Sequence, residues 1–104
     1  MKAADILTTA AGMVSGERAK QHGDKAINFA NIAALWNEFL SRRRTASAPL
    51  TSADVALMMV LFKVARTQTG QFNIDNALDI AGYSAIFGEL SSETVGEEEI
   101  RSFS

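Results

Sequence analysis

Two pairs of charged residues in the second half of the chain have the types and the spacing that phosphate binding requires. Lys63 and Arg66 lie one helical turn apart in an otherwise apolar segment, and Asp75 and Asp79 lie one turn apart further along the chain. Cations bind phosphate, arginine through its planar donor fork. Carboxylates on a helix can hold Mg²⁺, which takes oxygen ligands and keeps waters that a phosphate can replace. We therefore expect Lys63 and Arg66 to contact a phosphate, and Asp75 and Asp79 to hold Mg²⁺.

The same four charges also have a structural interpretation. A buried unpaired charge is costly, so a salt bridge between two helices would equally explain Lys63 and Asp79. Asp75 would then only favour the start of its helix. The spacing of the two aspartates alone favours this interpretation. For Lys63 and Arg66 the sequence does not separate a salt bridge from a binding site.

A polar cluster in the first third of the chain is a further candidate. His22, Gly23 and Asp24 precede a predicted helix, and the N-terminus of a helix can receive an anion. His22 can titrate near neutral pH, and Asn28 lies one turn beyond Asp24. We expect His22, Asp24 and Asn28 to complete the ligand site. The alternative is a polar turn in which Asp24 only caps the helix.

The other charged runs are expected to face solvent. Arg42, Arg43 and Arg44 could contact nucleic acid, but no aromatic residues are interleaved with them and the formal net charge is -2. We interpret them as a solvated helix end and expect no nucleic-acid partner. The acidic run 97–99 is interpreted as a solvated tail. A Gly-rich phosphate loop, a nucleophile elbow and an HExxH motif are all absent from the sequence, which argues against the hydrolases that those motifs define.

Four predicted helices must position the candidate residues. The first covers residues 3–14, the second runs from near 24 and ends in residues 41–44, the third covers about 51–68 and the fourth about 73–90. Each segment places its apolar residues at helical spacing, and strand-like alternation is absent from the sequence. The fold class is therefore all-α.

Local signals mark the ends and the faces of these helices. Thr51 and Asp54 resemble a capping box, Asn73 is a candidate N-cap, and Gly70 is expected to stop the third helix. The apolar face of the second helix comprises Phe29, Ile32, Ala33, Trp36, Phe39 and Leu40. The fourth helix has two apolar stripes, one of Ile74, Leu78, Ala81 and Ala85 and one of Ile80, Tyr83 and Phe87.

The third helix is the one around which the others must pack. From Val55 to Phe62 it carries no polar side chain, and a helix that is apolar on every side has to be enclosed by protein. Three flanking helices in so short a chain can scarcely enclose it, so we expect a homo-oligomer to complete the core. The predicted architecture is a small four-helix bundle in residues 1–90, followed by an acidic, flexible tail in residues 91–104.

Length and composition set further limits. The 104 residues suffice for one domain, and the absence of cysteine excludes a disulfide framework and fits a reducing compartment. The apolar runs are all far shorter than the ~20 residues that cross a bilayer. Asp5 interrupts the N-terminal segment before a signal-peptide core can form. We expect a cytoplasmic protein without a membrane partner.

The chain resembles a family of small phage and prophage proteins of uncharacterised function. The resemblance rests on the blocks HGD, ADVALMMVLFKVAR and DIAGY, in that order, and covers about residues 17–90. More distantly, the chain is similar to nucleotide-modification-associated domains of phages and to all-α nucleoside triphosphate pyrophosphohydrolases of the MazG and dUTPase type. These are helical bundles that oligomerise and hold Mg²⁺ through acidic residues on two helices. Their EExxE and ExxD signature is absent here; Asp75 and Asp79 match only the late acidic pair, and Lys63 and Arg66 stand where the glutamates would be.

These features together predict a phage-associated protein that binds or processes a nucleotide in a pocket between helices. Lys63 and Arg66 would meet phosphate, Asp75 and Asp79 would hold Mg²⁺ or a base edge, and His22 and Asp24 would close the site. Whether the nucleotide is hydrolysed is left open. The alternative is a non-catalytic oligomeric module that binds a host protein and whose charged residues form internal salt bridges.

Overall fold

The computed structural model of the chain describes residues 1–15 and 25–93, and within these ranges it is all-helical. The helices are α1 (Ala3–Ser15), α3 (Lys25–Ser41), α4 (Ser52–Arg66) and α5 (Ile74–Ser92), with no strand in the described part of the chain. All four predicted helices are present. The tail was predicted from residue 91, but α5 extends to Ser92, and residues 94–104 lie outside the described residues.

The first turns of α4 and α5 are fixed by the capping residues that the sequence indicates. Thr51 is the N-cap of α4: its Oγ1 accepts from the backbone N–H of Asp54 at 3.1 Å, and Asp54 Oδ2 accepts from the N–H of Thr51 at 2.9 Å. Asn73 is the N-cap of α5, where its Oδ1 accepts from the N–H of Asp75 at 2.9 Å. These bonds satisfy N–H groups that no carbonyl of the same helix can reach.

The C-terminal end of α4 differs from the prediction. The helix ends at Arg66 with Thr67 as its C-cap, short of the predicted end near residue 68. Gly70 lies beyond it in the turn that leads to α5, with a φ of 71°. Only glycine adopts this left-handed conformation at little cost. Gly70 therefore shapes the connection between the helices.

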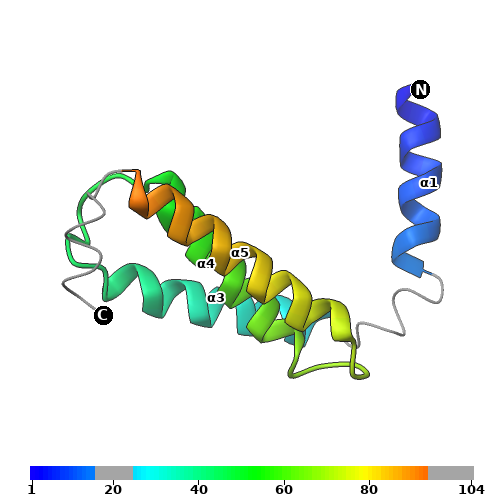
Figure 1. Cartoon of the computed structure of the whole chain (residues 1–104). Coiled ribbons are helices and arrows are strands. Elements are labelled where there is room, and N and C mark those ends of the chain that lie inside the picture. The colour runs from blue at the N-terminus through cyan, green and yellow to red at the C-terminus, as the bar shows by residue number, and fades with distance from the viewer. Residues whose placement is uncertain (16–24, 94–104) are drawn as a thin grey trace.

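Helix α4 is the central element, as predicted, but it is not enclosed. It packs against α3 and against α5, whereas α1 stands apart from all three (Figure 1). Trp36 Nε1 of α3 donates to the Met58 carbonyl oxygen of α4 at 2.7 Å, and Lys63 Nζ of α4 lies 2.9 Å from Asp79 Oδ2 of α5. The described residues thus form an open layer of three helices, and a closed four-helix bundle is not seen among them.

The buried core of the described residues is small. Its apolar members are Ile32, Ala56 and Ala65, which are 4%, 5% and 1% exposed. Val55 and Val64 of α4 keep 49% and 36% of their surface in contact with solvent. The described helices include none that is long and apolar enough to cross a bilayer.

Two helices present different faces from those expected. On α3 the contact face is turned by about one residue, so that Asn28 is 8% exposed while Phe29 is 64% exposed. On α5 the half-buried residues Ile80, Tyr83 and Phe87 share the side of Asp79, which faces α4. The other predicted stripe, Ile74, Leu78, Ala81 and Ala85, lies on the opposite side and is exposed. Both apolar stripes of α5 exist, but only one packs within the chain.

Candidate functional site

The predicted pair Lys63 and Asp79 forms an ion pair between α4 and α5. The Lys63 side chain is 15% exposed and that of Asp79 is 44% exposed, and Nζ and Oδ2 are 2.9 Å apart. The salt-bridge interpretation is therefore confirmed for these two residues. Because the carboxylate stays open to solvent and an ammonium has three donor hydrogens, the pair leaves Lys63 able to donate to a further group.

An aromatic ring brings the two predicted phosphate ligands together. Lys63 Nζ lies 5.3 Å and the Arg66 Cζ atom 5.5 Å from the centroid of the Phe62 ring. Both distances are within the range of a cation–π interaction. The last turn of α4 thus gathers two positive charges beside one apolar ring, which is not a feature that the sequence analysis identified.

Asn28 faces this end of α4 with an unused acceptor. Trp36, Ile32 and Asn28 are four residues apart along α3 and so share the face that contacts α4. Helices α3 and α4 run antiparallel, and the bond from Trp36 to Met58 fixes their register. Asn28 is eight residues before Trp36 and Arg66 is eight residues after Met58, so Asn28 and Arg66 lie at the same level. The Oδ1 atom of Asn28 is buried and has no hydrogen-bond partner within the described ranges. Such an atom costs about 1–3 kcal/mol, so it needs a reason to be there.

Of the two predicted metal ligands, Asp75 faces solvent, whereas Asp79 lies on the side of α5 that faces α4 and stays partly open to solvent. Asp75 is exposed in the first turn, one turn before Asp79. In the parts of the chain that the structure describes, no three His, Cys, Asp or Glu side chains form a cluster. Two carboxylates are a minimal set for Mg²⁺, which would take its remaining ligands from water and phosphate.

The remaining predicted ligands, His22 and Asp24, lie outside the described residues. The structure therefore brings Asn28, Lys63, Arg66 and Asp79 to one end of the layer, with Asp75 nearby on α5. Their predicted role in ligand binding stays a prediction.

A shallow hollow next to this end was not predicted. It has a volume of about 170 Å³ and is lined by residues of the α4–α5 turn and the start of α5, namely Thr67, Gln71, Phe72, Asn73, Asn76, Ala77 and Ile80. This is below the ~300 Å³ at which ligand pockets usually begin. Phe72, which is 89% exposed, is the one signal in the sequence that could have indicated it, as an aromatic residue in a polar turn.

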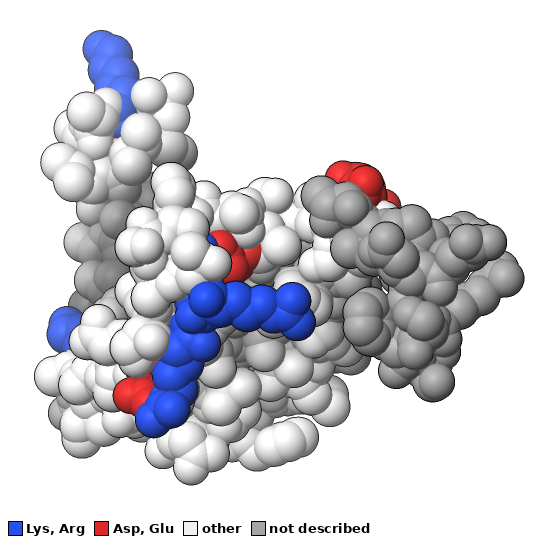
Figure 2. Space-filling model, turned by 90° about the vertical axis from the view of Figure 1, so that its left-hand side faces the viewer, with Lys and Arg blue, Asp and Glu red and all other residues white. Residues whose placement is uncertain are grey.

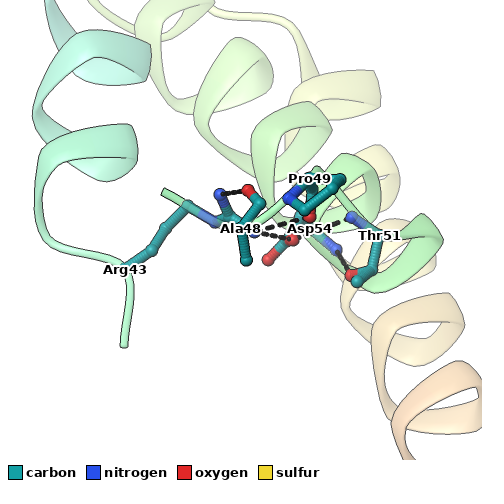
Figure 3. A network of polar contacts seen from close by, with 5 residues as sticks. All are labelled: Arg43, Ala48, Pro49, Thr51 and Asp54. Carbon is teal, nitrogen blue, oxygen red and sulfur yellow. Dashed lines mark hydrogen bonds and ion pairs between the residues drawn. The ribbon is translucent and has the colours of Figure 1, made fainter. Parts of the chain in front are cut away.

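A polar network at the opposite end of α4 was also not predicted. Arg43 follows the end of α3 and turns inward, with its side chain only 10% exposed. Its Nη1 donates to the Ala48 carbonyl oxygen at 2.9 Å, and its Nη2 donates to the carbonyl oxygen of Pro49 at 3.1 Å and to Asp54 Oδ2 at 2.7 Å (Figure 3). The interpretation of Arg43 as part of a solvated helix end was therefore wrong. The Arg43 side chain instead ties the connection between α3 and α4 to the capping box of α4.

The electrostatics of the network follow from these bonds. The pKa of the Asp54 carboxyl is lowered, chiefly because the Thr51 backbone N–H donates to it, with the Arg43 guanidinium adding to the effect against the cost of burial. The neighbouring Arg42 instead pairs with Glu38, and both of those side chains are exposed.

On the face in Figure 2, basic side chains form a narrow stripe with acidic atoms beside it. On this face the positive charge is confined to a stripe and does not spread into a broad patch.

Comparison with known proteins identifies the family. Residues 5–91 match the family described as "Domain of unknown function (DUF6378)". The chain belongs to the DUF6378 family. The match runs from α1 into the last turns of α5, so all the described helices are part of the DUF6378 domain.

Two phage proteins are similar to this DUF6378 chain. The "Gene 55 protein" of Mycobacterium phage L5 is 36% identical over 85 residues, which are 82% of this chain and 51% of the phage protein. The "Gene 55 protein" of Mycobacterium phage D29 is 32% identical over 93 residues, 89% of this chain and 58% of its own length. The chain thus spans little more than half the length of these relatives. No solved structure matches it. The predicted membership of a phage protein family is confirmed, whereas the likeness to MazG-type enzymes stays a prediction.

Proposed function

We propose that this DUF6378 protein is a phage-associated nucleotide-binding protein whose site is the polar end formed by α3, α4 and α5. The observation that carries the proposal is the buried Oδ1 of Asn28, which has no hydrogen-bond partner among the described residues and lies level with Arg66, one of the two cations beside Phe62. Lys63 and Arg66 supply only donors, which suit phosphate. Asn28 Oδ1 is an acceptor and suits an N–H of a base or a hydroxyl of a sugar. A nucleotide carries both a phosphate for Lys63 and Arg66 and a base or sugar donor for Asn28 Oδ1. Inorganic phosphate has no base and no sugar.

Each of the other predicted residues has a place in this proposal. Asp79 holds Lys63 in position, and the lysine keeps donors for the phosphate. Asp75 and Asp79 are accessible carboxylates that would hold Mg²⁺ brought in with the nucleotide, and the ion would neutralise phosphate charge. His22 and Asp24 would close the site. The proposal covers binding in the host cytoplasm and leaves open any hydrolysis of the nucleotide.

Thermal unfolding with a panel of nucleotides, with and without Mg²⁺, tests this function. A ligand that binds only the native protein at about 100 times its Kd adds roughly 2.7 kcal/mol of stability. We expect one class of nucleotide to raise the midpoint. The rise should be lost in Lys63→Met and Arg66→Met, and kept in Lys25→Met, whose exposed side chain lies at the start of α3.

Asn28 gives the test its specificity. Asn28→Leu should lose the response to the nucleotide and keep any response to inorganic triphosphate, because only the base or the sugar would use its Oδ1. If no nucleotide in the panel stabilises the protein, or if Lys63→Met responds as the parent does, the proposed function is wrong.

A second function, a non-catalytic oligomeric interaction module, is favoured by a different observation. Many large apolar side chains are half or more exposed: Ile6, Leu7, Val14, Ile27, Phe29, Phe72, Ile74 and Leu78. Where such side chains gather in a patch, they mark protein-binding sites. Under this function the pair Lys63 and Asp79 is purely structural. Lys63→Met and Asp79→Leu would then each destabilise the protein, while the double variant would be as stable as the parent.

A further inference from the structure

The shallow hollow at the α4–α5 turn lies beside the ion pair of Lys63 and Asp79. Thr67, which lines the hollow, comes four residues after Lys63, and Asn76, which also lines it, comes three residues before Asp79. Residues three or four apart on a helix are neighbours on one face, separated by about one turn, or roughly 5 Å along the axis. A ligand that contacts Lys63 can therefore reach into the hollow with a second group.

The size and charge of the hollow limit what that second group can be. Its volume is about 170 Å³, whereas pockets that enclose a whole small ligand usually begin near ~300 Å³. Only part of a nucleotide fits in this space. The residues that line the hollow are all uncharged, so a phosphate gains nothing by entering it. The base is the part of a nucleotide that suits the hollow.

The lining offers the contacts that a planar base uses. Phe72 is 89% exposed, so its ring is open for stacking, and Ala77 and Ile80 add apolar surface. Gln71 and Asn76 carry amides whose donors and acceptors can pair with the edge of a base. In the described part of the chain, no hydrogen bond engages either of these two amide side chains. The hollow thus combines an open ring with unused amide groups.

We infer that this hollow is the base subsite of the nucleotide site, in which the base stacks on Phe72 while the phosphate contacts Lys63. The inference rests on the nucleotide-binding function proposed above, and it leaves a sugar hydroxyl as the group for Asn28 Oδ1. Stacking on an aromatic ring is tolerant of base identity, so Phe72 supplies affinity. Contacts from Gln71 and Asn76 to the edge of the base supply any preference among bases.

Calorimetric titration of Phe72 variants tests the subsite. The probes are the triphosphates of adenosine, guanosine, cytidine and thymidine, and inorganic triphosphate serves as the probe without a base. Phe72→Ala should weaken nucleotide binding roughly 5- to 100-fold and leave the binding of inorganic triphosphate unchanged, because the stacking is lost and the cations remain. Phe72→Tyr keeps an aromatic ring and should bind nucleotides as the parent does.

Leu78→Ala is the matched control for loss of an exposed apolar side chain. Leu78 is 61% exposed, but it lies on the side of α5 opposite α4 and does not line the hollow. Leu78→Ala should bind every probe as the parent does. Both alanine variants should keep the helical circular dichroism signal, because neither removed side chain is buried.

Fluorescence provides a second measurement at the hollow itself. The parent has a single tryptophan, Trp36, whose Nε1 donates to the Met58 carbonyl oxygen within the protein. Phe72→Trp adds an indole at the hollow, and a base that stacks on it should quench its fluorescence beyond any change seen in the parent. Inorganic triphosphate should cause no such quenching.

Three results would overturn the subsite. If the parent binds a nucleotide and Phe72→Ala binds it equally well, the base lies elsewhere, while the nucleotide-binding function stands. If Phe72→Ala weakens inorganic triphosphate as much as it weakens nucleotides, the side chain supports the turn and does not contact a base. If the parent binds no nucleotide, the proposed function is wrong and the subsite is rejected with it.

Discussion

Arg42 and Arg43 are neighbours in the sequence with opposite environments. Arg42 pairs with Glu38 on the surface, where their side chains are 77% and 60% exposed. Arg43 is 10% exposed and donates to Asp54 and to the carbonyl oxygens of Ala48 and Pro49. An exposed ion pair contributes little to the free energy of unfolding because water screens it. The hydrogen bonds of Arg43 contribute more, because its guanidinium has lost most of its contact with water and needs partners within the protein. The two residues therefore form a matched pair for experiment.

Arg43→Met should destabilise the protein far more than Arg42→Met. Loss of the inward bonds should lower the free energy of unfolding by about 1–3 kcal/mol, while the surface variant should change it by less than about 0.5 kcal/mol. Urea denaturation followed by circular dichroism measures both values. Equal effects of the two substitutions would contradict the structural role assigned to Arg43.

Acid should weaken the capping box of α4 through Asp54. Because its folded pKa lies below the ordinary value of 3.8, the stabilisation is complete above that value and is lost as the pH falls through the folded pKa. Asp54→Asn lacks this dependence, so it should be less stable than the parent by about 1 kcal/mol near neutral pH. We expect this difference to shrink when denaturation is repeated near pH 3.

A control keeps this pH test specific to the network. Glu38→Gln removes a carboxylate from the exposed pair with Arg42 and should follow the pH profile of the parent. If Asp54→Asn shows the same acid dependence as the parent, the carboxylate of Asp54 does not support the start of α4.

Local chemistry explains which residues could be predicted from the sequence. Thr51, Asp54 and Asn73 act on backbone groups two or three residues away, so their roles follow from spacing alone. Arg43 reaches Asp54, 11 positions further along, across the non-helical connection between α3 and α4, and no periodic pattern describes such a connection. The pairing of Lys63 with Asp79 was one of two interpretations, because either a carboxylate or a phosphate satisfies a lysine.

At the scale of the helices, the sequence predicted which segments are helical but not which face each helix presents. Along a helix each residue turns the face by about 100°, so Asn28 and Phe29 exchange places if the contact face shifts by one position. That shift depends on the partner helix, here through the bond from Trp36 to α4. On α5, two apolar stripes compete for one neighbour, and the sequence gives no order of preference between them.

The α4–α5 connection depends on the left-handed backbone of Gly70. Gly70→Ala should lower the free energy of unfolding by about 1 kcal/mol, because a Cβ is strained at a φ of 71°. Gly70→Asn should cost less than Gly70→Ala, because asparagine tolerates this region better than alanine. Urea denaturation of the two variants gives the order. An equal cost for both would mean that the turn relaxes around the substitution.

At the scale of the whole molecule, the open layer leaves many large apolar side chains of the described residues exposed. Among the described residues only Ile32, Ala56 and Ala65 are buried apolar residues, and none of them is large apart from Ile32. Apolar burial is the main source of folding stability, at roughly 25 cal/mol per Å². Burial of so small a core offsets only a small part of the conformational entropy that a single chain loses when its helices become ordered.

The stability of the protein should therefore depend on its concentration. If copies associate through their exposed apolar faces, mass action stabilises the folded state, and a hundredfold increase in concentration should raise the thermal midpoint by roughly 5 to 10 °C. Circular dichroism in cells of different path length measures this over the required range. Leu78→Glu should abolish the dependence, because it charges the bare stripe of α5 without touching the side that packs on α4. A midpoint that stays constant with dilution would mean that the open layer is stable alone.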